Sequence, residues 1–389
     1  MLSSHYSGFG RWILSCIAGV ALHAQAAPQY TATLLTPPEG SYTTYVYAIS
    51  NAGVVGYVEP FSSIGSQPAY WSLQGEGRVL PTLAPSAVGR SIHYAYNINN
   101  AGQIVGRSST VLGDVHGYLL TPGGQIQDLG ALPMTRGGTH SPGSNAQDVN
   151  GVGSVVGESY TDDGLRAFLW TSNGGMRNLG VLEGGSFSTA LAINDAGSVV
   201  GVSEVAGGRR AFLWTEAGGM QDLGDLAGGA NSSTAKAING TGQVIGTSQT
   251  AEGSRAFLWT QAEGMVDLGL LSGHVESFAT GLNESGATVG YSRTANWYTS
   301  PFLWTREEGM IDLNSLLLTA DPLVSAGLTL TYASGINDAG QILVSGQLNG
   351  RSVTAVLTPV PEPSTWVLSL LGGGLLLMAV RRVRRGETH

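Results

Sequence analysis

The hexapeptide RAFLWT occurs at Arg166–Thr171, Arg210–Thr215 and Arg255–Thr260, and a fourth copy, SPFLWT, runs from Ser300 to Thr305. The starts of these copies are 44, 45 and 45 residues apart. A period of this length is typical of repeat architectures, in which each repeat is one small unit that buries its apolar faces against its neighbours. The recurrence therefore indicates a structural role for the hexapeptide rather than a catalytic one.

Two further phrases recur in fixed order with the hexapeptide. An Ile-Asn phrase with two glycines reads INDAGSVVG at 193–201 and INGTGQVIG at 238–246, with relatives at 49–56, 98–106, 149–157, 282–290 and 336–344. Looser forms of the hexapeptide lie at 69–72, 117–121 and 354–358, so both phrases reach seven copies. A third phrase, GGMQDLGDL, stands at 218–226 and has relatives at 174–182 and 264–271.

Each unit is predicted to contain four short strands. In the fourth unit these are Thr189–Asn194, Ser198–Glu204, Arg210–Thr215 and Met220–Leu226. Glycine, asparagine and aspartate between them suit tight hairpin turns, and β-branched and aromatic residues fill the strands. In RAFLWT, residues 211, 213 and 215 face one side and residues 212 and 214 the other, and both sides are largely apolar. Such a strand needs a sheet that is covered on both faces.

Four-stranded units of this length stacked around an axis form a β-propeller. The seventh unit ends with its third strand at Val353–Thr358, and a spare strand, Gln29–Thr36, precedes the first unit. Pairing the two would close the ring and remove its exposed edges. We therefore predict an all-β, seven-bladed propeller over residues 27–360, closed by the N-terminal strand. The rival architecture, an open β-solenoid, would need end caps that are not evident.

The N-terminal segment 1–26 is predicted to be a secretory signal peptide. Arg11 precedes a short apolar stretch, and Ala24-Gln25-Ala26 forms a cleavage motif before Ala27. The alternatives are a retained membrane helix, for which the stretch is short, and a lipoprotein site at Cys16, the single cysteine. The exported chain would then hold no disulfide and no thiolate metal site.

The C-terminal segment 361–385 has three ordered parts. Pro361-Glu362-Pro363 is followed by an apolar stretch, 365–380, predicted to be a short transmembrane helix, and then by a cluster of four arginines. The cluster consists of Arg381, Arg382, Arg384 and Arg385, and residues 386–389 form a tail. Arginines beside a transmembrane helix stay on the cytoplasmic side of the membrane. This end is therefore predicted to face the cytoplasm and the main body to lie outside, in agreement with the signal peptide. An ordinary C-terminal anchor is the alternative.

This segment resembles the PEP-CTERM sorting signal of Gram-negative bacteria. The resemblance implies recognition by an exosortase, cleavage near the Pro-Glu-Pro box, a transient inner-membrane anchor, and release or attachment at the cell surface. The repeats resemble the extracellular HAF family, whose His-Ala-Phe triplet has arginine in place of histidine at Arg166, Arg210 and Arg255. That second resemblance implies a secreted location and assigns no chemical role to individual residues.

Several patterns suggest chemistry, and each has a structural alternative. Gly-x-Ser recurs in five units, at 106–108, 157–159, 201–203, 246–248 and 290–292, but lacks the second glycine of a hydrolase nucleophile elbow. The repeated aspartates of the third phrase could ring a channel and bind cations, although turn capping is the preferred interpretation; they are Asp128, Asp222, Asp267 and Asp312. The histidines His93, His116, His140 and His274 have no metal-ligand spacing.

Loops that break the period are the natural places for binding. The segments 134–147, 294–300 and 317–331 do so, and we expect Trp297 and Tyr298 to be able to stack on sugar rings, unless they pack onto a blade. Candidate catalytic carboxylates outside the repeat register are the adjacent pairs Asp162-Asp163 and Glu307-Glu308. No catalytic residue, cofactor or metal site is predicted.

Charge argues against nucleic acid as a partner. Residues 27–360 hold 13 Lys and Arg against 25 Asp and Glu, a net charge of −12, and Lys236 is the single lysine. The sequence thus predicts a surface-displayed, non-enzymatic protein that binds or organises extracellular polysaccharide or surface proteins. The alternatives are a secreted glycan hydrolase or lyase on the same scaffold and a spacer without a ligand.

Overall fold

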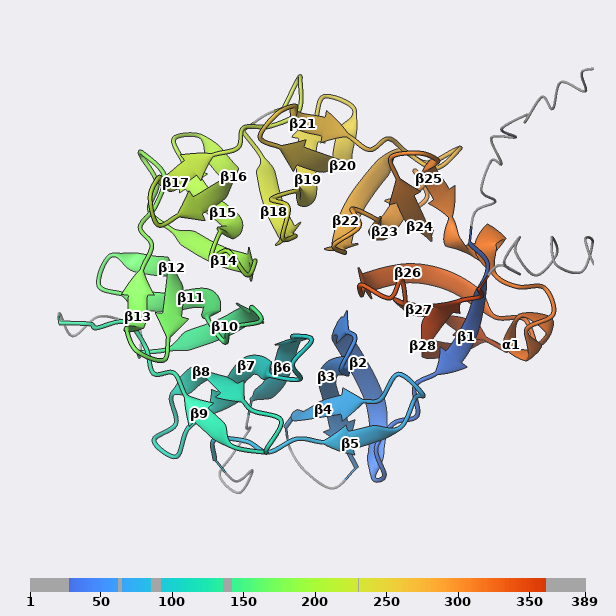
Figure 1. Ribbon diagram of the computed structural model, residues 1–389, viewed down its shortest axis with the longest axis horizontal. Helices are drawn as coiled ribbons and strands as arrows, with labels where there is room; N and C mark the ends of the chain where they lie inside the picture. The colour runs from blue at the N-terminus through green and yellow to red at the C-terminus, as the bar shows by residue number, and fades with distance from the viewer. Residues whose placement is uncertain (1–27, 62–64, 85–91, 136–141, 230, 362–389) are drawn as a thin grey trace, which may run out of the picture.

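Hairpins of the repeated phrases build seven antiparallel sheets around a central axis. The computed structural model describes residues 28–61, 65–84, 92–135, 142–229 and 231–361. Each sheet has four strands, and within this part of the chain helix is confined to two single turns. Figure 1 shows the sheets as blades of a ring, with the first strand of each unit innermost. The predicted seven-bladed propeller is confirmed.

The blades follow one another along the chain. Blade 1 contains β2 (Ser41–Ser50), β3 (Gly53–Pro60), β4 (Gln67–Trp71) and β5 (Gly77–Val79), and blade 2 contains β6 (His93–Ile98), β7 (Ile104–Ser109), β8 (Val115–Leu120) and β9 (Ile126–Asp128). Blade 3 contains β10 (Ser144–Val149), β11 (Val155–Thr161), β12 (Gly164–Thr171) and β13 (Gly175–Asn178), and blade 4 contains β14 (Ser188–Ile193), β15 (Val199–Val205), β16 (Gly208–Thr215) and β17 (Gly219–Asp222). Blade 5 contains β18 (Ser233–Ile238), β19 (Val244–Thr250), β20 (Gly253–Thr260) and β21 (Gly264–Asp267), and blade 6 contains β22 (Glu276–Leu282), β23 (Thr288–Arg293), β24 (Thr299–Thr305) and β25 (Gly309–Asp312). Blade 7 contains β26 (Thr329–Ile336), β27 (Ile342–Leu348), β28 (Arg351–Pro359) and, out of sequence order, β1 (Tyr30–Leu34).

The hydrophobic core lies between the blades. Phe212 and Trp214 pack on Val156 and Ala167 of blade 3, whereas Ala211, on the other face of the same strand, packs on Phe257 of blade 5. The alternation read from RAFLWT therefore holds, and each blade is covered on both faces by its neighbours. The fourth strand ends earlier than predicted, because β17 stops at Asp222 and the following Leu223–Leu226 segment crosses to the next blade.

The N-terminal strand closes the ring as predicted. It pairs antiparallel with β28 over the whole of β1, from Tyr30 opposite Pro359 to Leu34 opposite Ala355. Tyr30 is buried in the core of blade 7. In Figure 1 the blue β1 lies against the red β28 at the outer edge of that blade. Blades 1 to 6 are each formed by one continuous chain segment, whereas blade 7 joins the two ends of the body.

The long link of blade 6 to blade 7 supports this closure. It contains η1 (Leu313–Leu316) and α1 (Pro322–Ser325), short helices that the sequence patterns did not predict. The Asp321 carboxylate caps α1 and also accepts a hydrogen bond of 2.9 Å from the backbone N–H of Ala32 in β1. The backbone N–H of Leu318 donates to the Tyr30 carbonyl at 2.8 Å. The apolar link thus covers the outer edge of the closing strand.

The predicted targeting segments fall largely outside the described residues. These are the signal peptide 1–26 with Ala24, Ala26 and Ala27, and the part of the sorting signal beyond Pro361, including Glu362, Pro363, the apolar stretch 365–380 and the four arginines. Within the portion of the chain that the structure describes, no helix has the length and apolar character needed to cross a membrane.

Candidate functional site: the central channel

Each innermost strand carries a β-bulge at the same position. The pairing of β14 with β15 skips one residue between Ala190 and Ala192, and the six other first strands skip the equivalent residue. A bulge redirects the extra side chain. Here all seven extra residues line the central cavity, and we call them the bulge ring: Tyr47, Tyr96, Gln147, Leu191, Lys236, Thr280 and Ser334.

A glycine lies opposite the bulge in six of the seven blades. A Cβ on Gly201 would lie 2.0 Å from the Thr189 carbonyl oxygen, and the equivalent glycines of blades 1, 2, 3, 5 and 6 have the same approach at 1.9 or 2.0 Å. No side chain fits at such a distance. In these six blades the last glycine of the Ile-Asn phrase is therefore required by the backbone, and in blades 2 to 6 it is the glycine of the Gly-x-Ser pattern, whereas Val344 stands at this place in blade 7.

The serines of that pattern join blades and are not exposed nucleophiles. Ser203 and Ser248 are fully buried, and their hydroxyls accept hydrogen bonds of 3.0 Å from the backbone N–H groups of Leu182 and Leu226. Ser159 does the same for Leu132 at 2.9 Å. The structural interpretation of Gly-x-Ser is confirmed, because these hydroxyls hold the link between two blades.

The asparagines of the Ile-Asn phrase form a closed ring of hydrogen bonds. The Nδ2 of Asn99 donates to the Asn150 carbonyl at 2.8 Å, and the contact repeats from blade to blade until Asn337 donates to the Ser50 carbonyl at 3.2 Å. The Ser50 hydroxyl completes the ring by donating to the Asn99 carbonyl at 3.1 Å. We call these residues the asparagine belt: Ser50, Asn99, Asn150, Asn194, Asn239, Asn283 and Asn337.

The belt lies at one mouth of the channel, which we call the asparagine face. Next to it, carboxylates accept from the turn of the preceding blade: Asp195 from Gly151 N–H at 2.6 Å, Glu284 from Gly240 N–H at 3.0 Å and Asp338 from Glu284 N–H at 3.1 Å. This mouth is therefore acidic.

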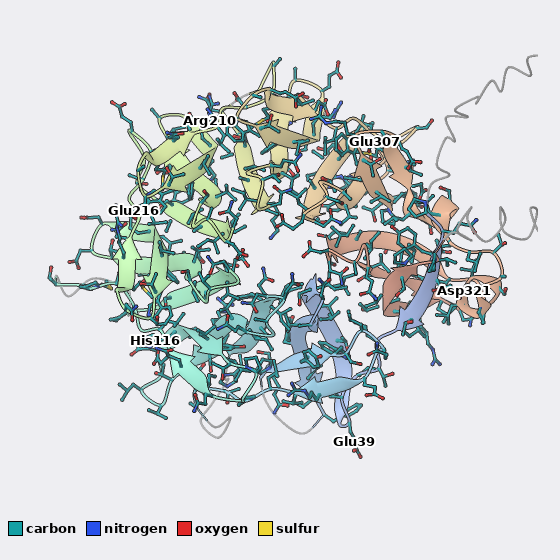
Figure 2. The ribbon with its side chains drawn as sticks, in the orientation of Figure 1. Glu39, His116, Arg210, Glu216, Glu307 and Asp321 are labelled. Atoms are coloured by element: carbon teal, nitrogen blue, oxygen red, sulfur yellow. The ribbon has the colours of Figure 1, made fainter. Side chains whose placement is uncertain are left out.

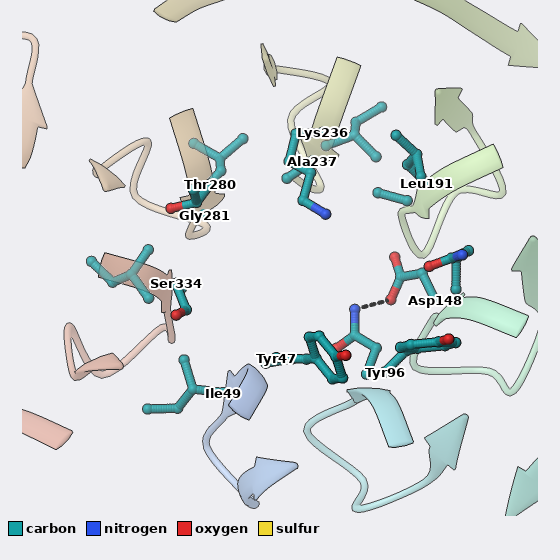
Figure 3. A pocket seen from close by; sticks show the side chains of 18 residues that line it. Tyr47, Ile49, Tyr96, Asp148, Leu191, Lys236, Ala237, Thr280, Gly281 and Ser334 are labelled. Carbon is teal, nitrogen blue, oxygen red and sulfur yellow. Dashed lines mark hydrogen bonds between the residues drawn. The ribbon is translucent and has the colours of Figure 1, made fainter. Parts of the chain in front are cut away.

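The bulge ring surrounds a cavity of about 390 Å³ in the middle of the channel (Figure 3). That volume lies within the ~300–1,000 Å³ range of small-molecule sites. Asp148 follows the bulge in β10 and accepts from Asn97 Nδ2 at 2.7 Å, and from the N–H groups of Val149 and Ile193, both at 2.8 Å. Desolvation by burial raises the pKa of Asp148 from 3.8 to about 6, although the hydrogen bonds from the two backbone N–H groups oppose the shift.

Stacked tyrosines extend from the cavity toward the opposite mouth. Tyr47 and Tyr96 of the bulge ring meet edge to face at 5.3 Å between ring centroids. Tyr57 stacks on Tyr45 at 4.6 Å and meets Tyr94 edge to face at the same distance. The Arg107 guanidinium lies over the Tyr94 ring at 4.9 Å. Tyr45 and Tyr47 remain 43% and 41% exposed, so this tyrosine cluster (Tyr45, Tyr47, Tyr57, Tyr94 and Tyr96) presents aromatic surface to the channel.

A second aromatic group lies on blades 6 and 7. Phe278 stacks on Tyr291 at 4.8 Å, and Tyr291 contacts Tyr332 at 4.6 Å. In the adjacent β23–β24 hairpin, Trp297 and Tyr298 are 71% and 75% exposed, and the Arg293 guanidinium lies 4.0 Å from the Trp297 ring. Neither residue packs into a blade, so both remain available as the ligand contacts that the sequence suggests.

The other predicted candidates do not meet in one place. The aspartates of the third phrase lie on the outermost strands or their ends, not around the channel, and cap turns: Asp128, Asp222 and Asp267 accept from the N–H groups of Gly130, Gly224 and Gly269, and Asp312 from Asn314. The turn-capping interpretation is confirmed, and the ring of cation-binding aspartates is wrong.

The catalytic candidates are also dispersed. Asp162-Asp163 lie in the β11–β12 turn of blade 3, and Asp162 accepts from Thr135 at 2.8 Å, whereas Glu307-Glu308 lie in the β24–β25 turn of blade 6. The first of these turns joins the second and third strands of a blade, and the other joins the third and fourth strands. Because successive antiparallel strands run in opposite directions, the two turns lie on opposite faces of the propeller. Glu307 and Arg210 lie away from the channel (Figure 2).

The histidines of the described region have separate partners. His93 is buried with its Nδ1 2.8 Å from the Ser108 hydroxyl, His116 Nδ1 lies 2.9 Å from Asp128, and His274 Nδ1 lies 3.1 Å from the Ser272 carbonyl. His140 lies outside the described residues. Among the residues with defined positions, no group of three or more His, Cys, Asp or Glu could hold a metal ion.

The bulge ring was missed from sequence, although a signal for it exists. Its members stand two residues before the Ile-Asn pair, where the seven repeats have Tyr, Tyr, Gln, Leu, Lys, Thr and Ser. The position directly before it is alanine in six of the seven repeats and valine in the first. Variation next to a nearly constant alanine identifies a place that the architecture does not determine.

Residues 359–385 match the PEP-CTERM protein-sorting motif. The match indicates export with surface sorting and processing by an exosortase. It does not extend over the repeats, whose HAF-type character stays a prediction. No curated protein matches the chain.

Solved structures share the fold. A puromycin hydrolase aligns with a TM-score of 0.50 and 12% identity over 82% of this chain and 52% of its own. A prolyl endopeptidase aligns with a TM-score of 0.52 and 9% identity over 86% of this chain and 51% of its own. The present chain thus spans about half the length of these two enzymes. At such identities the similarity concerns the propeller alone.

Proposed function

We propose that the protein is a surface-displayed, non-enzymatic binder of extracellular polysaccharide and that the sugar chain is bound at the central channel. The observation that carries this proposal is the bulge ring together with the tyrosine cluster. All seven repeats contain the same β-bulge, and each bulge places one side chain in the cavity. Two of these side chains are tyrosines that belong to the tyrosine cluster.

The chemistry of the site suits carbohydrate. Sugar rings offer C–H groups on their faces and hydroxyls at their edges, so they bind where aromatic planes stand beside amide, hydroxyl and charged groups. Tyr47 and Tyr96 supply the planes, and Gln147, Ser334 and Asn97 supply polar groups at the same level of the channel. Tyrosine also contributes contact area at little cost in side-chain entropy.

The proposal is tested by titrating the purified protein with exopolysaccharide from its own host and measuring the binding affinity by calorimetry. The double variant Tyr47→Ala/Tyr96→Ala is expected to bind at least about tenfold more weakly, a loss of about 1.4 kcal/mol. The matched variant Trp297→Ala/Tyr298→Ala removes two exposed aromatic residues outside the channel and should bind normally. Absence of binding to any glycan would contradict the proposal, and loss of binding only in the second variant would move the site to the hairpin.

The alternative of a secreted glycan hydrolase or lyase is separated by product analysis of the same mixtures. A hydrolase generates new reducing ends, and a lyase generates unsaturated sugars that absorb in the ultraviolet. Unchanged polysaccharide after prolonged incubation with the wild-type protein is the result that agrees with a binding role.

A further inference from the structure

Lys236 is the single lysine of the 389-residue chain, and it stands in the bulge ring. Its side chain is exposed to the channel, and its amine points into the lumen in Figure 3. To the residues that the structure describes, its ammonium makes no hydrogen bond and no ion pair within 4.0 Å. An ammonium group offers three N–H donors. This one therefore presents them to whatever enters the cavity.

Asp148 is the acidic group that interacts with Lys236 through space, but its oxygens are already engaged. One oxygen accepts from Asn97 and from Val149 N–H, and the other accepts from Ile193 N–H. These contacts join blades 2, 3 and 4, so the carboxylate has a structural role. Lys236 has no equivalent task in the framework.

Folding does not require a lysine at this position. The equivalent residues of blades 4, 6 and 7 are Leu191, Thr280 and Ser334, so the bulge accepts apolar and small polar side chains alike. The strands around the channel partly desolvate the ammonium and thereby lower the pKa of Lys236, although Asp148 opposes the shift.

We propose that Lys236 binds the carboxylate of an acidic sugar, a uronic acid residue of the polysaccharide, inside the channel. The inference rests on the proposed function and names its substrate class. The uronate ring lies beside Tyr47 and Tyr96, and its carboxylate accepts from the ammonium across the cavity. Entry is from the mouth opposite the asparagine face, because the asparagine face carries Asp195, Glu284 and Asp338 and repels anions.

The experiment compares a uronic acid oligosaccharide with a neutral oligosaccharide of the same length, titrated into the full-length protein in detergent. The wild-type protein is expected to bind the acidic chain at least about tenfold more tightly. Lys236→Met should lose this preference and keep its affinity for the neutral chain, whereas Lys236→Arg should keep most of the preference. Arg351→Gln, which removes an exposed cation at the start of β28, outside the bulge ring, is the matched control.

The outcomes separate the two proposals. Equal affinities for both oligosaccharides in the wild type, or an unchanged preference in Lys236→Met, overturn the role of Lys236 and leave glycan binding intact. Failure to bind either oligosaccharide and the host polysaccharide overturns both. A melting temperature of Lys236→Met equal to or above that of the wild type shows that any loss is not due to misfolding.

A chemical readout is independent of affinity measurements. Lys236 carries the one side-chain amine, so an amine-acylating reagent followed by peptide mass analysis reports on this residue alone. The reaction near pH 8 should be faster than that of a free lysine side chain, and saturating uronic acid oligosaccharide should slow it at least about tenfold. Labelling that is indifferent to the acidic oligosaccharide would refute carboxylate binding at this amine.

Discussion

At the scale of single residues, the asparagine belt shows how a repeated side chain becomes a whole-ring constraint. Each belt asparagine donates to the next blade and also accepts from the N–H group four residues ahead, as Asn194 does from Ser198 at 2.9 Å. One side chain therefore fixes both its own hairpin turn and the position of a neighbour. The same residue type would be replaceable if it served the turn alone.

The belt gives a direct stability prediction. Asn194→Ala removes the donor to the carbonyl of the buried Asn239 and the acceptor for the N–H of the half-buried Ser198, and it leaves both backbone groups without these partners. The free energy of unfolding should fall by about 1–3 kcal/mol. Thermal or urea denaturation measures this. The control, Asn173→Ala in an exposed turn, should change stability by less than about 0.5 kcal/mol; similar losses in both variants would argue against the belt.

Asp148 predicts a pH dependence with a definite sign. Because its folded pKa is raised from 3.8 to about 6, the folded state binds its proton more tightly than the unfolded state. Its contribution to stability is therefore full below about pH 4 and is lost as pH rises through about 6. Lys236 and Asp195 are the charged groups that act on it.

The test of this sign is the difference between two unfolding curves. Asp148→Asn cannot titrate, so the stability of wild type minus that of Asp148→Asn should decrease between pH 4 and pH 6. The variant also loses one acceptor of the Ile193 or Asn97 contact, which lowers its stability at every pH and leaves the slope as the readout. A flat or rising difference would show that Asp148 is not destabilised by burial.

At the scale of strands, the bulge is the device that converts a uniform blade into a variable site. Gly201 permits the close approach of the Thr189 carbonyl, and the extra residue Leu191 is thereby turned into the channel. The remaining repeats use the same arrangement with different side chains, and in blade 7 Val344 takes the place of the glycine beside a strand with two irregularities. Function can thus vary without disturbing the stacking of the blades.

This device predicts a large difference between two glycine substitutions. Gly201→Ala forces a methyl group against the Thr189 carbonyl, 2.0 Å away, and should destabilise the protein by about 1–3 kcal/mol or prevent folding. Gly123→Ala is the control, because its nearest neighbour is a side-chain oxygen at 3.9 Å and its backbone is not left-handed. Equal melting temperatures for the two variants would contradict the steric role of Gly201.

The strands also show which features the sequence could reveal. Blade number followed from the seven copies of the recurring phrases, the closing order from the spare strand Gln29–Thr36, and the two-faced packing from RAFLWT, because alternation and spacing are visible directly in the residue pattern. Bulges could not be read in that way, since an inserted residue is indistinguishable from ordinary strand residues until the partner strand is known. The exposed Trp297 and Tyr298 were visible as an interruption of the period, whereas Lys236 lay inside a regular strand and drew attention only as the sole lysine.

At the scale of the whole molecule, closure and export are compatible because they use separate parts of the chain. The closing pair is complete at Pro359, where β28 ends opposite Tyr30. The sorting motif covers 359–385, so cleavage near Pro361-Glu362-Pro363 would leave all seven blades intact. The propeller can therefore be separated from its C-terminal segment without opening the ring.

This arrangement predicts the outcome of altering the box. Replacing Pro361, Glu362 and Pro363 by alanine should block exosortase processing, so that the chain keeps its C-terminal segment and accumulates in the membrane fraction of its host. Intact-mass analysis and immunoblots of membrane and secreted fractions measure this. Arg351→Gln, which lies in β28 before the box, should be processed like the wild type, and the melting temperature of the cleaved product should equal that of the uncleaved one. Normal release of the alanine variant would mean that export does not proceed through this box, and a lower melting temperature of the cleaved product would mean that the ring extends beyond Pro361.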